Sequence, residues 1–69
     1  MSFILPPMSK EDAEEMRRLM LLVHKTEAAA ATWLYTTHPV FRVTPEAMLK
    51  RDELGVAWVI SHLMDALAP

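Results

Sequence analysis

The chain has 69 residues, a net charge of −2 and no cysteine. This length predicts one small domain, and the lack of cysteine excludes disulfides and thiolate metal sites. The charge gives no global attraction to nucleic acid. No apolar run approaches the roughly 20 residues of a membrane-spanning helix. The first residues, MSFILPPM, lack the basic start and long apolar run of a signal peptide, so we expect a cytoplasmic protein.

The apolar content is high for so short a chain. Hydrophobic residues make up 52% of the sequence, although small domains expose a large share of their surface. A lone core of this size yields only about 3–5 kcal/mol of stability. Because neither disulfides nor thiolate-bound metal can add to it, we predict a homodimer that covers the excess apolar area.

Residues 1–8 form a predicted extended arm, followed by a single helical domain over residues 9–69. Phe3, Ile4 and Leu5 are consecutive large apolar residues, and Pro6-Pro7 then favours an extended backbone. Two interpretations remain open for the arm. It either frays as an ordinary terminus or docks on helices of its own chain or of a partner.

Ser9 is the predicted N-cap of the first helix, with acidic residues in the first turn. Apolar residues recur along this helix at helical spacing, and Leu21 and Leu22 widen the stripe beyond one face. The helix therefore has two apolar contacts to make, one with its own domain and one with a second chain. Because no proline or glycine lies between Met8 and Pro39, a continuous helix from Lys10 to about Thr36 is the preferred prediction. The alternative is a break near Thr26, which would then cap a second helix from Glu27.

Pro39 ends this helical region, and a connector with either Val40 or Phe41 buried follows. Thr44-Pro45-Glu46 is a strong helix start, and the resulting short helix ends near Lys50-Arg51. Asp52 then caps an apolar last helix. The predicted fold is all-α, with a long first helix, a short middle helix and this last helix. Residues spaced for one face of the last helix are its predicted core: Val56, Val59, Ile60, Leu63, Met64 and Leu67.

Residues 28–67 resemble the C-terminal toxin-binding domain of Xre/MbcA/ParS-type antitoxins. The matching pieces are Trp33-Leu34, Thr37-His38-Pro39, Thr44-Pro45-Glu46 with Leu49, and Glu53-Leu54-Gly55 with Val59. The resemblance implies a helical, dimerising, protein-binding fold. The chain has Phe41-Arg42-Val43 where that family has a glycine-containing turn. In size and character it is also similar to small phage-encoded proteins that inhibit host regulators, such as quorum-sensing anti-activators.

No residue set in the sequence predicts catalysis or a cofactor. No two of the three histidines, His24, His38 and His62, stand four residues apart on a helix, so no metal site is expected. Ser9 and Ser61 lack a nucleophile elbow, and one glycine cannot form a phosphate-binding loop. Asp12, Glu14 and Glu15 in the first helix are followed by Arg17 and Arg18, a pattern typical of a solvated face rather than of a catalytic carboxylate pair.

The predicted function is therefore a non-enzymatic inhibitor that binds and blocks another protein, either a toxin-like enzyme or a transcription regulator of a phage or bacterial host. Trp58 and His62 lie four residues apart, away from the predicted core of the last helix, and Tyr35 and Arg42 are expected to complete a partner-binding patch. Arg17 and Arg18, with Lys25, form a second candidate surface and support the alternative of a small DNA-binding regulator. Core or dimer contacts are expected from Met16, Met20, Val23, Trp33, Ile60 and Leu63.

Overall fold

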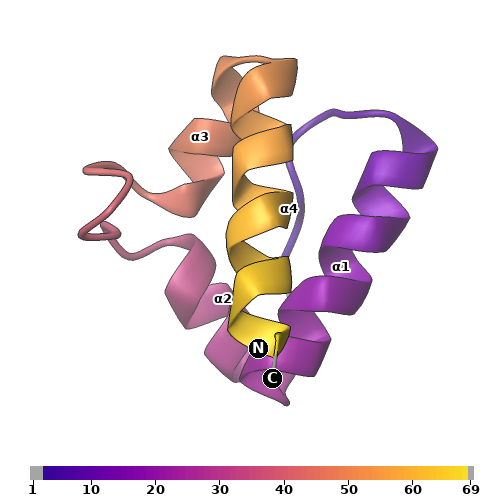
Figure 1. Ribbon diagram of the computed structural model, residues 1–69, viewed down its shortest axis with the longest axis vertical. Coiled ribbons are helices and arrows are strands. Elements are labelled where there is room, and N and C mark those ends of the chain that lie inside the picture. Colours follow the sequence, from indigo (N-terminus) through magenta and orange to yellow (C-terminus); the bar gives the residue numbers. More distant parts are fainter. Residues whose placement is uncertain (1–2, 69) are drawn as a thin grey trace.

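The computed structural model describes residues 3–68, in which four helices follow one another: α1 (Lys10–His24), α2 (Glu27–Leu34), α3 (Pro45–Arg51) and α4 (Glu53–Leu67). This part of the chain contains no strand, so the predicted all-α class is confirmed. In Figure 1, α4 crosses the front of the molecule, with α1 on one side and α2 and α3 on the other. Both α1 and α3 pack against α4. Met1 and Ser2 of the predicted arm and the final Pro69 lie outside the described residues.

The predicted continuous helix from Lys10 to Thr36 is wrong, and the alternative break near Thr26 is confirmed. Lys25 ends α1 with a positive φ of 76°, and its amide donates to the carbonyl oxygen of Leu21 at 2.8 Å. Thr26 then caps α2, its hydroxyl oxygen accepting from the amide of Ala29 at 3.1 Å. A straight helix would have carried the following alanines away from the core. The break turns α2 back, so that Ala30, Ala31 and Leu34 are fully buried.

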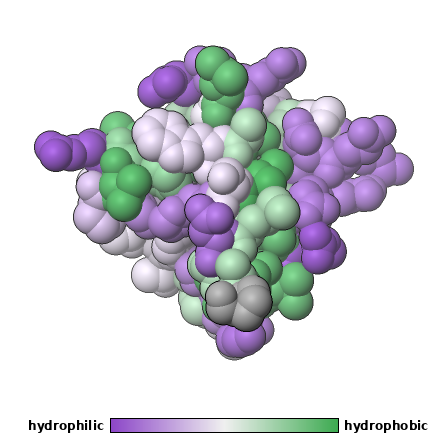
Figure 2. Space-filling view, viewed as in Figure 1, coloured by the Kyte–Doolittle hydropathy of each residue, from purple (hydrophilic) through white to green (hydrophobic). Residues whose placement is uncertain are grey.

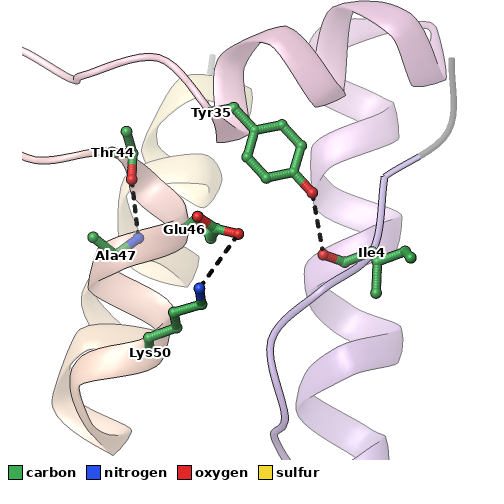
Figure 3. Close-up of polar contacts among 6 residues, drawn as sticks. All are labelled: Ile4, Tyr35, Thr44, Glu46, Ala47 and Lys50. Atoms are coloured by element: carbon green, nitrogen blue, oxygen red, sulfur yellow. Dashed lines mark hydrogen bonds and ion pairs between the residues drawn. The ribbon is translucent and has the colours of Figure 1, made fainter.

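The other predicted helix starts are confirmed. Ser9 accepts from the amide of Asp12 at 3.1 Å at the start of α1. Thr44 accepts from the amide of Ala47 at 3.1 Å, and Pro45 opens α3 (Figure 3). These side chains satisfy amides that have no partner within the first turn of a helix.

Asp52 joins α3 to α4 without an intervening loop. It is the C-cap of α3, and its carboxylate accepts from the amide of Gly55 at 2.8 Å as the N-cap of α4. This short corner brings the start of α4 against the body of α3. A Cβ atom on Gly55 would lie 2.1 Å from the carbonyl oxygen of Met48, far inside van der Waals contact. Glycine is therefore the residue that lets the two helix backbones approach so closely.

The arm docks on its own chain, which confirms the second of the two interpretations for its described residues. Phe3 is almost fully buried in the core, with Leu5 and Met8 packed against that core. Arg17 holds the arm to α1, because its guanidinium lies 4.5 Å from the centre of the Phe3 ring and donates to the Phe3 carbonyl oxygen at 3.2 Å. In Figure 1 the arm passes behind α4 on its way to the start of α1.

The core predictions for α1 and for the connector agree with the structure. Met16 and Met20 are buried, and Val23 and Trp33 are partly buried against the core. In the connector, Phe41 is the buried residue and Val40 is exposed.

The prediction for α4 is wrong in part. Val56, Val59 and Leu63 are buried and Ile60 is partly buried, but Met64 and Leu67 are exposed. Each residue turns an α-helix by about 100°, so a residue eight positions on is rotated by about 80°. Met64 therefore points about 80° away from Val56, outside the buried face of α4. Within residues 3–68, no helix combines the length and apolar character needed to cross a lipid bilayer.

The close approach at Gly55 predicts that Gly55→Ala destabilises the protein. Alanine favours helix over glycine by about 1 kcal/mol, but its methyl group would force α3 and α4 apart, a change that costs about 1–3 kcal/mol. Urea unfolding should therefore show a net loss of stability. The matched control, Ala57→Gly on the exposed side of α4, should lose about 1 kcal/mol through helix propensity alone. A Gly55→Ala protein that is more stable than the parent would contradict this packing.

Candidate functional site

Helix α4 has apolar side chains on both of its faces. One face packs into the core through Val56, Val59 and Leu63. The opposite side, which we call the outer α4 face, is exposed and consists of Leu54, Ala57, Trp58, Ser61 and Met64, with Glu53 and Asp65 near its two ends. Leu54 is 75% exposed, Trp58 49% and Met64 56%. In Figure 2, hydrophobic (green) and weakly polar (pale) side chains lie over the front of the molecule, and hydrophilic (purple) side chains lie beside them over α1.

Trp58 is half-exposed but has a fixed support. The centre of its ring lies 5.7 Å from that of Phe41, at an edge-to-face angle of 72°. Phe41 is buried and also lies 5.3 Å from the ring of His62. The connector between α2 and α3 therefore holds the indole from beneath, which limits the entropy that Trp58 would lose on binding.

The connector itself is fixed by local hydrogen bonds around His38. The His38 amide donates to the carbonyl oxygen of Val43 at 3.0 Å, and the Arg42 amide donates to that of His38 at 2.8 Å. His38 Nδ1 accepts from the amide of Val40 at 3.1 Å. Arg42 adopts a φ of 67°, in the left-handed region that a tight turn requires. At this turn the buried Phe41 is followed directly by the exposed Arg42.

All three histidines belong to one chain of ring contacts. His38 stacks on Phe41 with ring centres 4.5 Å apart and meets His62 edge-on at 4.7 Å. Trp33 lies 6.1 Å from His38 on one side and 5.0 Å from His24 on the other. The series joins α1, α2, the connector and α4. Its outer edge forms a groove of about 310 Å³ whose lining includes His24, Trp33 and His38.

Burial lowers the pKa of two of these imidazoles. The pKa of His38 is lowered first by burial and second by the nearby His62, and burial also lowers the pKa of His24. The buried Nε2 of His24 has no hydrogen-bond partner among the described residues. The lowered pKa values favour the neutral form of both imidazoles, His24 packed against Trp33 and His38 packed against Phe41. Within residues 3–68, no three potential metal ligands gather in a group that could hold a metal ion.

The structure brings together only part of the predicted patch. Trp58 and His62 are neighbours on α4, and both contact the ring of Phe41, which Arg42 follows directly in the chain. The hydroxyl of Tyr35 donates instead to the carbonyl oxygen of Ile4 in the arm at 3.4 Å (Figure 3). The ring contacts of Trp58 and His62 within the described residues come from the connector and not from Tyr35.

The basic edge of α1 is occupied by contacts within the chain. Arg17 holds Phe3 and pairs with Glu27 at 3.6 Å, and Arg18 pairs with Glu15. Lys25, the third basic residue of that candidate surface, lies beyond the last residue of α1. Arg17 therefore fixes the position of the arm, a role that was not predicted for it.

Two residues of this region were missed by the reasoning from sequence alone. Leu54 is the most exposed apolar side chain of α4, and its spacing of four residues from Trp58 was the available signal. The sequence suggested His38 only as a possible metal ligand and as part of the antitoxin-like piece Thr37-His38-Pro39, although it is the centre of the ring contacts. Nothing in its local sequence indicates that α4 would bring His62 against it.

Comparisons with known protein families, characterised proteins and solved structures give no match to this chain. The geometry of the site is therefore the basis for the function proposed below.

The lowered pKa values predict that the protein loses stability as the pH falls. Between about pH 8 and about pH 5, His24 and His38 take up protons in the unfolded chain before they do so in the folded one. The free energy of unfolding therefore decreases as the pH falls below about 6.5, the usual histidine pKa. The decrease continues until the pH reaches the lower pKa values that these two histidines have in the folded chain. Replacing His38 by Asn keeps an acceptor for the Val40 amide and removes one of these groups.

Urea unfolding at several pH values checks this expectation. His38→Asn should flatten the dependence of stability on pH, whereas Thr37→Ala, an exposed change next to it, should keep the slope of the parent. An equal slope in all three proteins would show that His38 does not contribute.

Proposed function

We propose that this chain is a non-enzymatic, protein-binding inhibitor that acts in the cytoplasm by covering a surface of a partner protein. The observation that carries the proposal is the outer α4 face, where a half-exposed tryptophan stands between an exposed leucine and an exposed methionine. Tryptophan is enriched at binding hot spots, and methionine adapts to differently shaped partners. A contiguous exposed apolar patch is typical of an interaction surface.

The nature of the partner follows from the resemblance to the antitoxin domains and from the similarity in size to phage-encoded anti-activators. Both relationships favour a toxin-like enzyme or a transcription regulator as the blocked protein. The alternative of a DNA-binding regulator receives less support, because Arg17 and Arg18 are already paired within the chain. The outer α4 face carries acidic residues at both ends, which would repel phosphate groups.

We also propose a homodimer, formed through a surface other than the outer α4 face. Ile4 is 82% exposed, and its carbonyl is hydrogen-bonded to the exposed Tyr35. These two side chains present apolar area outside the core. An interface built around them would leave α4 free for the partner.

Trp58→Ala should strongly weaken partner binding without unfolding the chain. The expected loss is more than about 2 kcal/mol of binding free energy, or about thirtyfold in affinity. The helical circular dichroism should be preserved because Trp58 is not part of the core. The matched control is Leu22→Ala, which removes an exposed leucine from α1.

The experiment begins with affinity capture from host lysate, comparing the parent, Trp58→Ala and Leu22→Ala by quantitative mass spectrometry. Proteins that depend on Trp58 but not on Leu22 are then purified and their affinities measured. The proposal also requires that the activity of such a partner fall when the parent chain is added. It fails if capture is the same with all three chains, or if Trp58→Ala unfolds the protein.

Sedimentation equilibrium tests the homodimer. At micromolar concentration the parent should have about twice the chain mass of 7.9 kDa. Ile4→Ser should give a folded monomer, whereas Val40→Ser, a change at another exposed apolar residue, should stay dimeric. A folded parent with the mass of one chain would contradict the proposal.

A further inference from the structure

A groove of about 370 Å³ lies between α1 and α4, and its lining includes Ala57, Ser61 and Met64 of the outer α4 face. Its lining combines two kinds of residue. Three carboxylates come from the ends of the two helices: Asp12, Glu53 and Asp65. Between them the surface is largely apolar and is formed by residues of α4: Val56, Ala57, Ile60 and Met64.

A second hollow, of about 280 Å³, adjoins this groove and shares Asp12, Glu53 and Val56 with it. It extends the surface to Met8 of the arm, to Leu49 and Lys50 of α3 and to Asp52. Along α4 alone, the twelve residue steps from Glu53 to Asp65 span about 18 Å. The combined groove is therefore long enough to hold about three turns of a helix.

The three carboxylates of the groove of 370 Å³ have no ion-pair partner in the described part of the chain. Elsewhere, Glu15, Glu27 and Glu46 each pair with a basic side chain. No ion pair within residues 3–68 involves Asp12, Glu53 or Asp65, and no basic residue lines the groove of 370 Å³. The groove of 370 Å³ thus combines a largely apolar floor with negative charge that no ion pair within residues 3–68 offsets. Lys50, in the second hollow, is already paired with Glu46.

This charge pattern argues against a second copy of the chain as the occupant. In an antiparallel pair of α4 helices centred on the outer α4 face, Glu53 of each copy would lie opposite Asp65 of the other. Both ends of such an interface would bring like charges together, which is unfavourable. A complementary occupant carries apolar side chains along its length and basic side chains beside them.

We propose that the groove between α1 and α4 binds an amphipathic helix of the partner protein in which lysine or arginine residues flank an apolar stripe. The inference rests on the proposed function, since it assigns the chemistry of the partner surface that α4 covers. The apolar stripe would lie on Ala57, Ile60 and Met64. The basic residues would reach Asp12 on one side and Glu53 and Asp65 along α4, while Trp58 holds the far edge of the helix.

Two synthetic helical peptides provide the test. Both carry the same leucine stripe, flanked by lysine in one and by glutamate in the other. Isothermal titration with the full chain should show binding of the lysine peptide that weakens as salt is added, and at least tenfold weaker binding of the glutamate peptide.

Two variants locate the binding site. The triple variant Asp12→Asn, Glu53→Gln, Asp65→Asn should weaken binding of the lysine peptide at least tenfold. Ala57→Arg, which places a basic side chain in the groove at an exposed position, should do the same. The matched control, Leu22→Arg on α1, should leave the affinity unchanged. Circular dichroism checks that each variant is folded.

Equal binding of both peptides, no binding of the lysine peptide, or binding unaffected by Ala57→Arg would overturn the inference. A parent dimer that Ala57→Arg dissociates would identify a second copy as the occupant and overturn it too. Its failure is distinguishable from failure of the proposed function. If capture depends on Trp58 but the lysine peptide does not bind, the function stands and only the chemistry of its partner is wrong.

Discussion

The close contact between α3 and α4 at Gly55 is the constraint on which the rest of the structure depends. With no Cβ atom at this residue, α4 approaches the Met48 carbonyl and leaves α3 directly from Asp52, without a loop. The direction of α4 is thereby set by backbone contact and one capping carboxylate. A helix fixed in this way covers the buried residues of α1 and still presents its other side to solvent.

Two consequences of this placement meet at the outer α4 face. The core takes Val56, Val59 and Leu63 from α4, with Ile60 partly buried at its edge, while Leu54, Trp58 and Met64 remain exposed. The same placement brings His62 against His38 and Trp58 against Phe41. The ring of His62 therefore packs against His38 and Phe41 of the connector. Phe41 in turn supports the half-exposed indole of Trp58. A rigid, supported tryptophan beside an acid-lined groove is a suitable surface for binding another protein.

Local signals predicted most of the fold. The caps at Ser9, Thr44 and Asp52 act through side-chain hydrogen bonds within three residues, so they could be predicted without tertiary information. The break at Lys25 was predicted only as the alternative to a continuous helix, because Thr26 offers a local cap but the alanines that follow favour helix. Local signals do not decide between the two, since the turn is stabilised by the burial of Ala30, Ala31 and Leu34. Likewise, the spacing rule identified the buried face of α4 but extended it too far. The contacts of Tyr35 with the arm and of His38 with His62 join distant parts of the chain, which no local pattern specifies.

We propose that one face of α4 packs into the core and that the outer α4 face binds a partner protein. Hydroxyl-radical footprinting, read by mass spectrometry on the free chain and on its complex with the captured partner, tests this most directly. Trp58 and Met64 should react in the free chain and become protected in the complex. Tyr35 should react equally in both, and the buried Met20 should stay unreactive in both. Unchanged reactivity of Trp58 and Met64 in the complex, with protection at Tyr35 instead, would contradict the account.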